Sequence, residues 1–179
     1  THQWKAVNQN QPDTAAYRQY IKNQITELLT GSGDIYTLFW DIPPKLDDPS
    51  VNELVRRLQP GILINDRGFS AGDFSTPERN YKSNAAESHN RFVHLTEACN
   101  AVGEQSWGWR HGEDYHTLRY LTASIDRIMA MGGSYLLNIG PDALGNVPEK
   151  SVEALHQIGK FMRLNGESIY GTRPAPTYH

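Results

Sequence analysis

The sequence has 179 residues, of which 21% are charged and 38% are hydrophobic. This composition is typical of a globular domain and excludes an intrinsically disordered chain. The length suits one domain with its own core but is short for a complete α/β barrel, which needs roughly 250 residues. The net charge of −3 gives no electrostatic reason to expect nucleic acid or an acidic membrane as a partner.

The spacing of apolar residues and histidines argues against a membrane protein and a metalloprotein. No apolar run approaches the roughly 20 residues of a membrane span. The seven histidines show no tight metal-ligand spacing, so neither a metal nor another cofactor is expected. Cys99 is the single cysteine and is expected to be a buried, small apolar side chain. The chain begins at Thr1 without an initiator Met or a leader, so we expect the natural protein to start earlier.

The first part of the chain predicts two helices and two strands in alternation. Apolar residues at helical spacing predict a helix over 13–30, and an apolar, β-rich run predicts a buried strand over 34–41. A second helix is expected over 49–58 and a second strand over 62–67. A strand, a helix and a strand within about 35 residues form a βαβ unit, so the two strands should be parallel.

The second part begins with a segment that has no clean period. Residues 68–90 are rich in Gly, Ser, Asn and Pro and are expected to form a long functional loop. The next segment is ambiguous: 92–96 reads as a strand and 99–102 as a turn. The remaining elements are clear, namely a helix over 115–131, a strand over 134–140 and a helix over 148–164.

Polar residues follow the predicted strands at the ends where parallel α/β folds carry their sites. Asp41 ends the first strand, Arg67 ends the second and Glu78 lies in the loop beyond it, whereas Trp107 and Trp109 follow the third. Hydrolysis of a sugar needs one carboxylic acid and one carboxylate. Aromatic faces and charged donors bind the C–H faces and hydroxyls of the sugar. The combination therefore indicates a carbohydrate-cleaving site without naming the sugar.

Each of these residues also has an ordinary structural interpretation. An aspartate at a strand end, such as Asp41, caps a helix or forms a turn about as often as it catalyses. Glu78 would more often be a solvated charge, and Arg67 could tie down its loop. Trp107 and Trp109 could equally be core residues.

A series of motifs resembles the α-L-fucosidases of glycoside hydrolase family twenty-nine. The motifs occur in the family's order over nearly the whole chain. They are the helix 20–30 with the strand 33–41, the segments 58–67 and 72–78, Ser106-Trp-Gly-Trp109, 132–141, Ile158-Gly and 165–172.

The resemblance implies a role for each candidate residue. Asp41 matches the nucleophile that attacks the anomeric carbon, and Glu78 matches the general acid that later acts as a base. Arg67 matches a residue that contacts the sugar near the nucleophile, Trp107 matches an aromatic that packs on fucose, and Trp109 would help to shape the pocket. The implied activity is a retaining exo-glycosidase that releases terminal α-L-fucose through a covalent fucosyl-enzyme. Its two carboxyl groups should lie roughly 5–5.5 Å apart.

The resemblance also implies a fold and a set of partners. Residues 1–179 should form a single partial catalytic domain, the C-terminal half of a (β/α)8-like, TIM-type barrel with about four parallel strands. The expected substrates are fucosylated oligosaccharides or glycoproteins, with no nucleic acid, no membrane and no cofactor. The N-terminal half would come from the same protein, from a second chain, or from a homo-oligomer of half-barrels; we favour the first. A non-catalytic carbohydrate-binding or barrel-completing fragment is the alternative.

Overall fold

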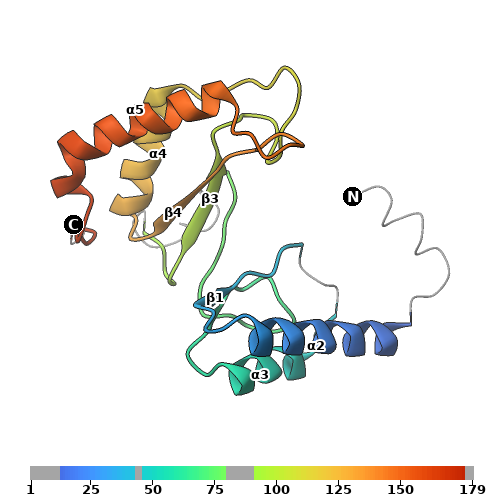
Figure 1. The fold of residues 1–179 in the computed structure, drawn as a ribbon. Coiled ribbons are helices and arrows are strands. Elements are labelled where there is room, and N and C mark those ends of the chain that lie inside the picture. Colours follow the sequence, from blue (N-terminus) through green and yellow to red (C-terminus); the bar gives the residue numbers. More distant parts are fainter. Residues whose placement is uncertain (1–12, 43–45, 80–90, 176–179) are drawn as a thin grey trace. The chain divides into compact units, whose positions relative to one another are not determined.

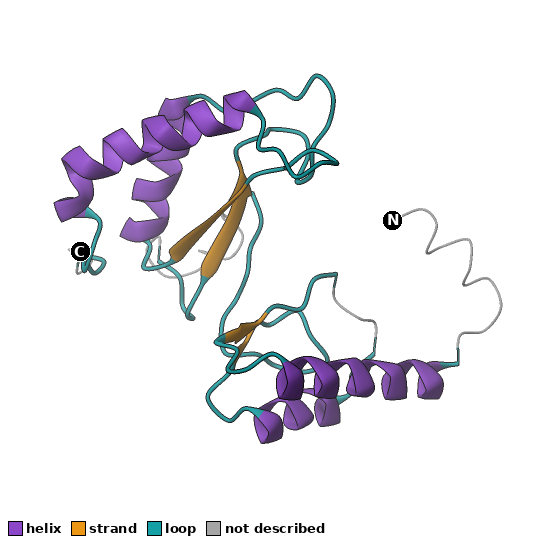
Figure 2. Ribbon diagram, in the orientation of Figure 1, coloured by secondary structure: helices purple, strands orange, loops and turns teal. Residues whose placement is uncertain are grey.

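The computed structural model describes residues 13–42, 46–79 and 91–175. The chain divides into two compact units, Thr1–Asp73 and Phe74–His179. Helices and strands alternate along the described part of each unit, in the order that the sequence predicts (Figures 1 and 2). None of the helices in this part of the chain is long and apolar enough to cross a membrane.

The first unit is a parallel βαβ unit preceded by a helix. Its elements are α2 (Thr14–Gly31), β1 (Thr37–Leu38), α3 (Pro49–Leu58) and β2 (Leu63–Ile64). β1 pairs with β2 in parallel, and α2 packs against α3 (Figure 1). The bounds of α3 and the parallel pairing confirm the prediction, whereas both strands are shorter than expected.

Side-chain caps determine where the two helices of this unit begin. The carboxylate of Asp13 accepts a hydrogen bond from the Ala16 N–H at 2.9 Å and caps α2. Asp48 caps α3 by accepting from the backbone N–H of Ser50 at 3.2 Å, and Pro49 occupies the first turn. The Ser50 hydroxyl also donates to Asp48 at 2.5 Å and holds the pKa of that carboxyl below its usual value.

The core of the first unit lies between the two helices and the short sheet. Its buried residues are Ile25, Leu29, Val51, Val55, Ile62, Ile64 and Phe69. Gln59 closes one end of this core. Its side-chain amide donates to the carbonyls of Leu29 (2.9 Å) and Gly33 (2.8 Å) and accepts from the Ile35 N–H (2.8 Å). The end of α2 is therefore tied to the segment that enters β1.

The second unit is also built on a parallel βαβ unit. Its elements are β3 (Glu97–Ala101), α4 (Leu118–Ala130), β4 (Ser134–Asn138), α5 (Glu149–Asn165) and a short 3-10 helix, η2 (Gly166–Ser168). β3 and β4 pair in parallel over their full lengths. The expected helix over 115–131 begins three residues later, because Thr117 caps it by accepting from the Tyr120 N–H.

One face of this sheet packs against α4. Ala98 and Ile128 are fully buried there, and Phe92, Met129 and Tyr135 pack against them. On β4 the next residue, Leu136, lies on the opposite face because side chains alternate along a strand, and it is exposed.

The prediction for the segment before α4 was wrong by several residues. The strand is Glu97–Ala101, not 92–96, and Cys99 lies within it instead of starting a turn. Cys99 is buried, as expected of a small apolar side chain. Asn100 is also fully buried, and its side-chain oxygen accepts from the Ala101 N–H at 2.8 Å. Packing of Ala98 against α4 and pairing with β4 make this polar-looking segment a strand.

Part of the segment 68–79, expected to belong to a long loop, pairs with the strand β3 and the residue before it. Ser75 forms a parallel bridge with Thr96, and Glu78 forms one with Cys99. The backbone from Ser75 to Glu78 therefore runs alongside β3 as a short extra strand. Residues 80–90 of the expected loop lie outside the described residues.

Candidate active site

Asn65 determines the backbone path into Asp41. The Trp40 N–H donates to the Asn65 Oδ1 at 2.7 Å, and the Asn65 Nδ2 donates to the Trp40 carbonyl at 2.8 Å. Asn65 is fully buried, so both bonds are shielded from water. Because Trp40 bonds to a side chain instead of a neighbouring strand, β1 ends at Leu38 and not at residue 41 as expected. Asp41 follows directly from this clamp.

The indole of Trp40 is held as firmly as its backbone. Its Nε1–H donates to the Asn52 Oδ1 at 3.1 Å, and its ring meets Phe69 edge to face with centroids 5.1 Å apart. Gly68 lies directly against the indole, and a Cβ there would stand 2.1 Å from the Trp40 Cδ1. Asp41 therefore extends from a residue that cannot shift without disturbing the core.

Asp41 and Arg67 form an ion pair in the first unit. The Arg67 Nη1 lies 3.3 Å from the Asp41 Oδ1. The guanidinium is only 13% exposed and lies 5.1 Å from the centre of the Phe39 ring, whereas the Asp41 carboxylate is 75% exposed. Arg67 is thus a fixed cation beside an accessible carboxylate. Ile42 follows with φ of +38°, a strained conformation for a β-branched residue and one that recurs at functional sites.

Glu78 lies in the second unit on the segment that pairs with β3. The Cys99 N–H donates to the Pro77 carbonyl at 2.8 Å, and the Arg79 N–H donates to the Cys99 carbonyl at 2.9 Å. These two bonds flank Glu78 and set the position of its backbone. Its side chain is exposed. A backbone held on both sides with an exposed carboxyl group suits proton transfer to or from a ligand.

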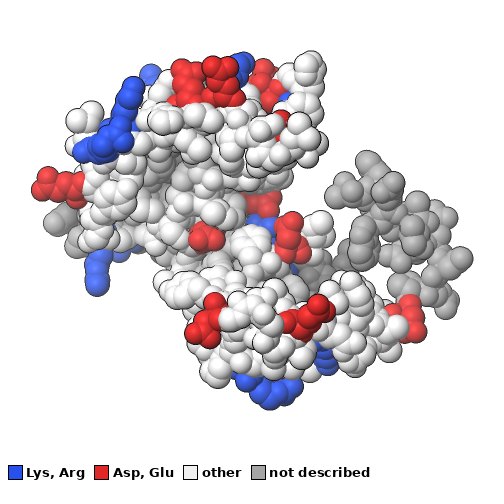
Figure 3. Space-filling model, in the orientation of Figure 1, with Lys and Arg blue, Asp and Glu red and all other residues white. Residues whose placement is uncertain are grey.

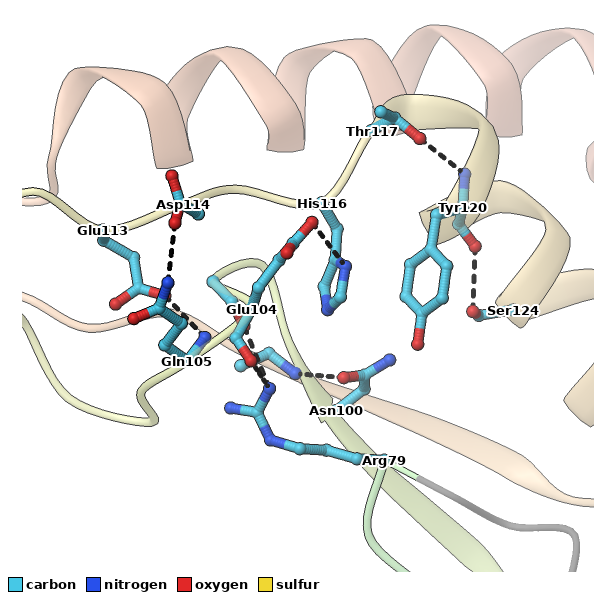
Figure 4. A network of polar contacts seen from close by, with 12 residues as sticks. Arg79, Asn100, Glu104, Gln105, Glu113, Asp114, His116, Thr117, Tyr120 and Ser124 are labelled. Atoms are coloured by element: carbon cyan, nitrogen blue, oxygen red, sulfur yellow. Dashed lines mark hydrogen bonds and ion pairs between the residues drawn. The ribbon is translucent and has the colours of Figure 1, made fainter.

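The loop after β3 carries Trp107 and is held from three directions. The Asn138 Nδ2 donates to the Trp107 carbonyl at 2.7 Å, and the Arg79 guanidinium lies 4.4 Å from the centre of the Trp107 ring. The Glu113 carboxylate accepts from the Gln105 N–H at 2.8 Å, and Figure 4 shows Glu113 and Gln105 facing each other across this loop. The loop is therefore an ordered structure.

Trp107 and Trp109 line the same shallow hollow, together with Tyr115. Trp107 is 37% exposed and Trp109 is 52% exposed, so neither is a core residue. Gly140 permits the close packing behind them. A Cβ on Gly140 would stand 2.5 Å from the backbone of Gly108 and Trp109. Two accessible aromatic rings beside one hollow form a surface that suits the C–H face of a sugar.

The structure therefore brings the predicted residues together in two groups, one in each unit. Asp41 meets Arg67 in the first unit, and Trp107 and Trp109 share a hollow in the second. Arg79 follows Glu78 and links it to Trp107. The sequence did not predict a role for Arg79, because an arginine beside a glutamate carries no signal of its own.

Metal-ligand chemistry adds no second kind of site within the described part of the chain. No group of three or more His, Cys, Asp or Glu side chains could hold a metal ion among these residues. On the face shown in Figure 3, acidic and basic side chains of both units are scattered over a mostly uncharged surface.

Comparison with known proteins identifies the family. The α-L-fucosidase family model matches residues 1–167. The chain is 31% identical over 158 residues to the α-L-fucosidase of Dictyostelium discoideum. This match covers 83% of this chain and 32% of that protein. The chain is also 30% identical over 121 residues to the tissue α-L-fucosidase of Rattus norvegicus. That match covers 63% of this chain and 25% of that protein. The chain belongs to the α-L-fucosidase family.

Solved structures share the fold. α-L-Fucosidase isoenzyme 1 from Paenibacillus thiaminolyticus superposes with a TM-score of 0.83 at 30% identity, over 96% of this chain and 45% of that one. The Lactobacillus casei α-L-fucosidase AlfC, in complex with α-L-fucose product, gives 0.73 at 28% identity, over 87% and 48%. The chain thus spans about half of these structures and a third or less of the two curated relatives.

Proposed function

We propose that the protein is a retaining exo-α-L-fucosidase that releases terminal α-L-fucose from fucosylated oligosaccharides or glycoproteins. The observation that carries the proposal is the ion pair of Asp41 with Arg67, which lie three residues beyond the ends of β1 and β2, in a chain of the α-L-fucosidase family. An accessible carboxylate held beside a fixed cation suits a nucleophile that attacks an anomeric carbon. The fucose complex of the Lactobacillus casei relative supports fucose as the sugar.

In the proposed mechanism Asp41 attacks the anomeric carbon while Glu78 protonates the departing glycosidic oxygen. The C–O bond to the leaving group breaks as the bond between the anomeric carbon and the Asp41 carboxylate forms. Glu78, now ionised, then takes a proton from water, which attacks the anomeric carbon and releases Asp41. Arg67 would bind the sugar near the nucleophile, Trp107 would pack on its apolar face, and Trp109 would help to shape the pocket.

We also propose that residues 1–179 are one partial catalytic domain, the second half of a (β/α)8-type barrel. Two parallel βαβ units and the match to about half of each solved fucosidase support this arrangement. The first half, from the same protein or from a second chain, would supply the rest of the sugar pocket. It would also cover the open edges of the short sheets.

Replacing the nucleophile in the complete protein tests the proposal. Asp41→Gly should lower turnover of an aryl α-L-fucoside by at least about a thousandfold, the scale of loss when a catalytic nucleophile is removed. Added azide should restore turnover, because the anion enters the space of the lost carboxylate and forms a C–N bond at the anomeric carbon. Turnover is followed by release of the aryl alcohol, and the fucosyl azide by mass spectrometry.

Asp34→Gly is the matched control, since Asp34 is exposed and lies before β1; it should keep normal turnover. Normal activity of Asp41→Gly would show that Asp41 is not the nucleophile. A 2-fluorofucoside should leave a covalent adduct on Asp41, detected by intact mass and peptide mapping. Absence of any adduct, together with absence of turnover, would point to a non-catalytic carbohydrate-binding protein.

A further inference from the structure

Arg79 follows Glu78 directly and has an unusual backbone conformation. Its φ is +48°, in the left-handed region that non-glycine residues other than Asn and Asp rarely adopt. Its N–H nevertheless continues the pairing with β3 by donating to the Cys99 carbonyl at 2.9 Å. The chain therefore turns sharply at Arg79 while its backbone remains attached to the sheet. A conformation of this kind persists where surrounding contacts hold it.

The side chain of Arg79 supplies such contacts. Its Nη1 donates to the carbonyls of Gly103 at 3.2 Å and Glu104 at 2.7 Å (Figure 4). The same guanidinium lies 4.4 Å from the centre of the Trp107 ring. Hydrogen bonds from a charged donor are stronger than those between neutral groups, and a guanidinium also attracts the face of an indole. One side chain thus links the end of the Glu78 segment to the loop that carries Trp107.

This link joins two functions that the sequence separates by nearly thirty residues. A general acid must lie within about 2.6–3.2 Å of the oxygen that it protonates. A displacement of about 1 Å in an active site can cost a hundredfold in rate. The carboxyl of Glu78 therefore needs a fixed position relative to the ring on which the sugar would rest.

We propose that Arg79 is a positioning residue that holds the general acid Glu78 and the aromatic platform Trp107 in a fixed relation. The inference rests on the proposed function, because it presumes that Glu78 and Trp107 act on fucose. Arg79 itself need not touch the substrate. It acts through the carbonyls of Gly103 and Glu104 and through the indole.

Binding of free α-L-fucose to the complete protein tests the link to Trp107. Arg79→Gln should weaken fucose binding about tenfold, because the ring loses its cation and the loop loses two charged hydrogen bonds. Trp107→Ala should also weaken binding, and the double variant should bind no more weakly than Trp107→Ala alone. Isothermal titration calorimetry gives the three dissociation constants. Arg119→Gln is the control, because it removes the same charge from an exposed position on α4. This variant should bind fucose as the wild type does.

Leaving-group dependence tests the link to Glu78. Protonation by the general acid matters greatly for a sugar leaving group and little for an activated 4-nitrophenyl group. Arg79→Gln should therefore lower kcat/KM about a hundredfold for a fucosylated disaccharide but only about tenfold for the aryl fucoside. A purely structural role would lower both values equally. Arg79→Gly separates the side chain from the turn, since glycine adopts a positive φ without strain, and it should behave like Arg79→Gln.

The outcomes separate failure of the inference from failure of the proposed function. If Trp107→Ala leaves fucose binding unchanged, the role of Trp107 falls and the inference falls with it. If Trp107→Ala weakens binding while Arg79→Gln and Arg79→Gly match the Arg119→Gln control, only the inference is overturned. Should Arg79→Gln fail to fold, Arg79→Lys replaces it. Lysine keeps the charge but lacks the planar fork, so the unequal loss for the two substrates should remain.

Discussion

Asn65 and Arg79 both position a candidate site residue through hydrogen bonds to backbone groups. Asn65 bonds the backbone on both sides of Trp40 and thereby directs Asp41 outward. Arg79 bonds two carbonyls in the loop that carries Trp107. In both cases a half-buried or buried polar side chain forms hydrogen bonds with backbone groups. Such bonds fix a loop more firmly than an exposed ion pair would.

His116 gives the second unit a predicted dependence on pH. Its ring stacks on Tyr120 with centroids 4.0 Å apart, and its Nδ1 lies 3.5 Å from the Glu104 Oε1 (Figure 4). Burial lowers the pKa of His116 below its usual 6.5. Glu104 and Glu113 oppose this shift and Arg79 adds to it, but the net direction is downward.

The sign of the effect on stability follows from proton binding. As pH falls below about 6.5, the unfolded chain protonates this histidine more readily than the folded chain does. The contribution of His116 to the free energy of unfolding is therefore complete above pH 6.5 and is lost as pH falls through the lowered pKa. Urea unfolding between pH 7.5 and 5.5 should show a smaller decline in stability for His116→Phe, which keeps a ring against Tyr120, than for the wild type. An equal or steeper decline in the variant would contradict the assignment.

At the scale of elements, the return of the chain after β2 depends on a glycine. A Cβ on Gly72 would stand 2.3 Å from the carbonyl group of Asn65 and 2.6 Å from the Ile64 oxygen. Next to it, the Asp73 N–H donates to the Ile64 carbonyl and the Asp73 carboxylate accepts from the Ile64 N–H at 2.8 Å. Burial tends to raise the pKa of Asp73, but the Ile64 N–H and Arg56 together hold it below its usual value.

Gly72→Ala should lower the free energy of unfolding by about 2 kcal/mol or more, because the methyl group meets backbone atoms that cannot rotate away. Gly61→Ala is the matched control. A Cβ on Gly61 would meet no atom within 4 Å, so this change should alter stability by no more than about 1 kcal/mol. Chemical denaturation of both variants provides the comparison. Equal stability of the two would show that the strand return tolerates a side chain.

Local signals explain which elements the sequence predicts well. The helix α3 begins and ends where expected because Asp48 caps it and Pro49 starts it, and both signals are local. The strand β3 was misplaced because its residues have no strand pattern of their own. Ala98 and Asn100 become strand residues by packing against α4 and pairing with β4, which lie more than fifteen residues along the chain.

At the scale of the whole molecule, the proposed half-barrel predicts that residues 1–179 alone lack useful activity. Turnover of an aryl α-L-fucoside by the purified chain should be at least about a thousandfold below that of the complete protein, because substrate would be held by only part of its pocket. Circular dichroism should first confirm that the helices form. Turnover at the rate of the complete protein would show that these residues already contain the whole pocket.

The sequence by itself determined the family, the alternation of helices and strands, and the positions of Asp41 and Arg67 just beyond the ends of neighbouring parallel strands. Such strands bring their carboxyl ends together, so the contact between these two side chains followed from the pattern. Only the tertiary structure decided that Glu78 pairs with β3 and that Arg79 links it to Trp107. Those contacts join segments far apart in sequence. Their hydrogen bonds are accepted by backbone carbonyls, and because every residue has a backbone carbonyl, the sequence does not indicate which residue is the acceptor.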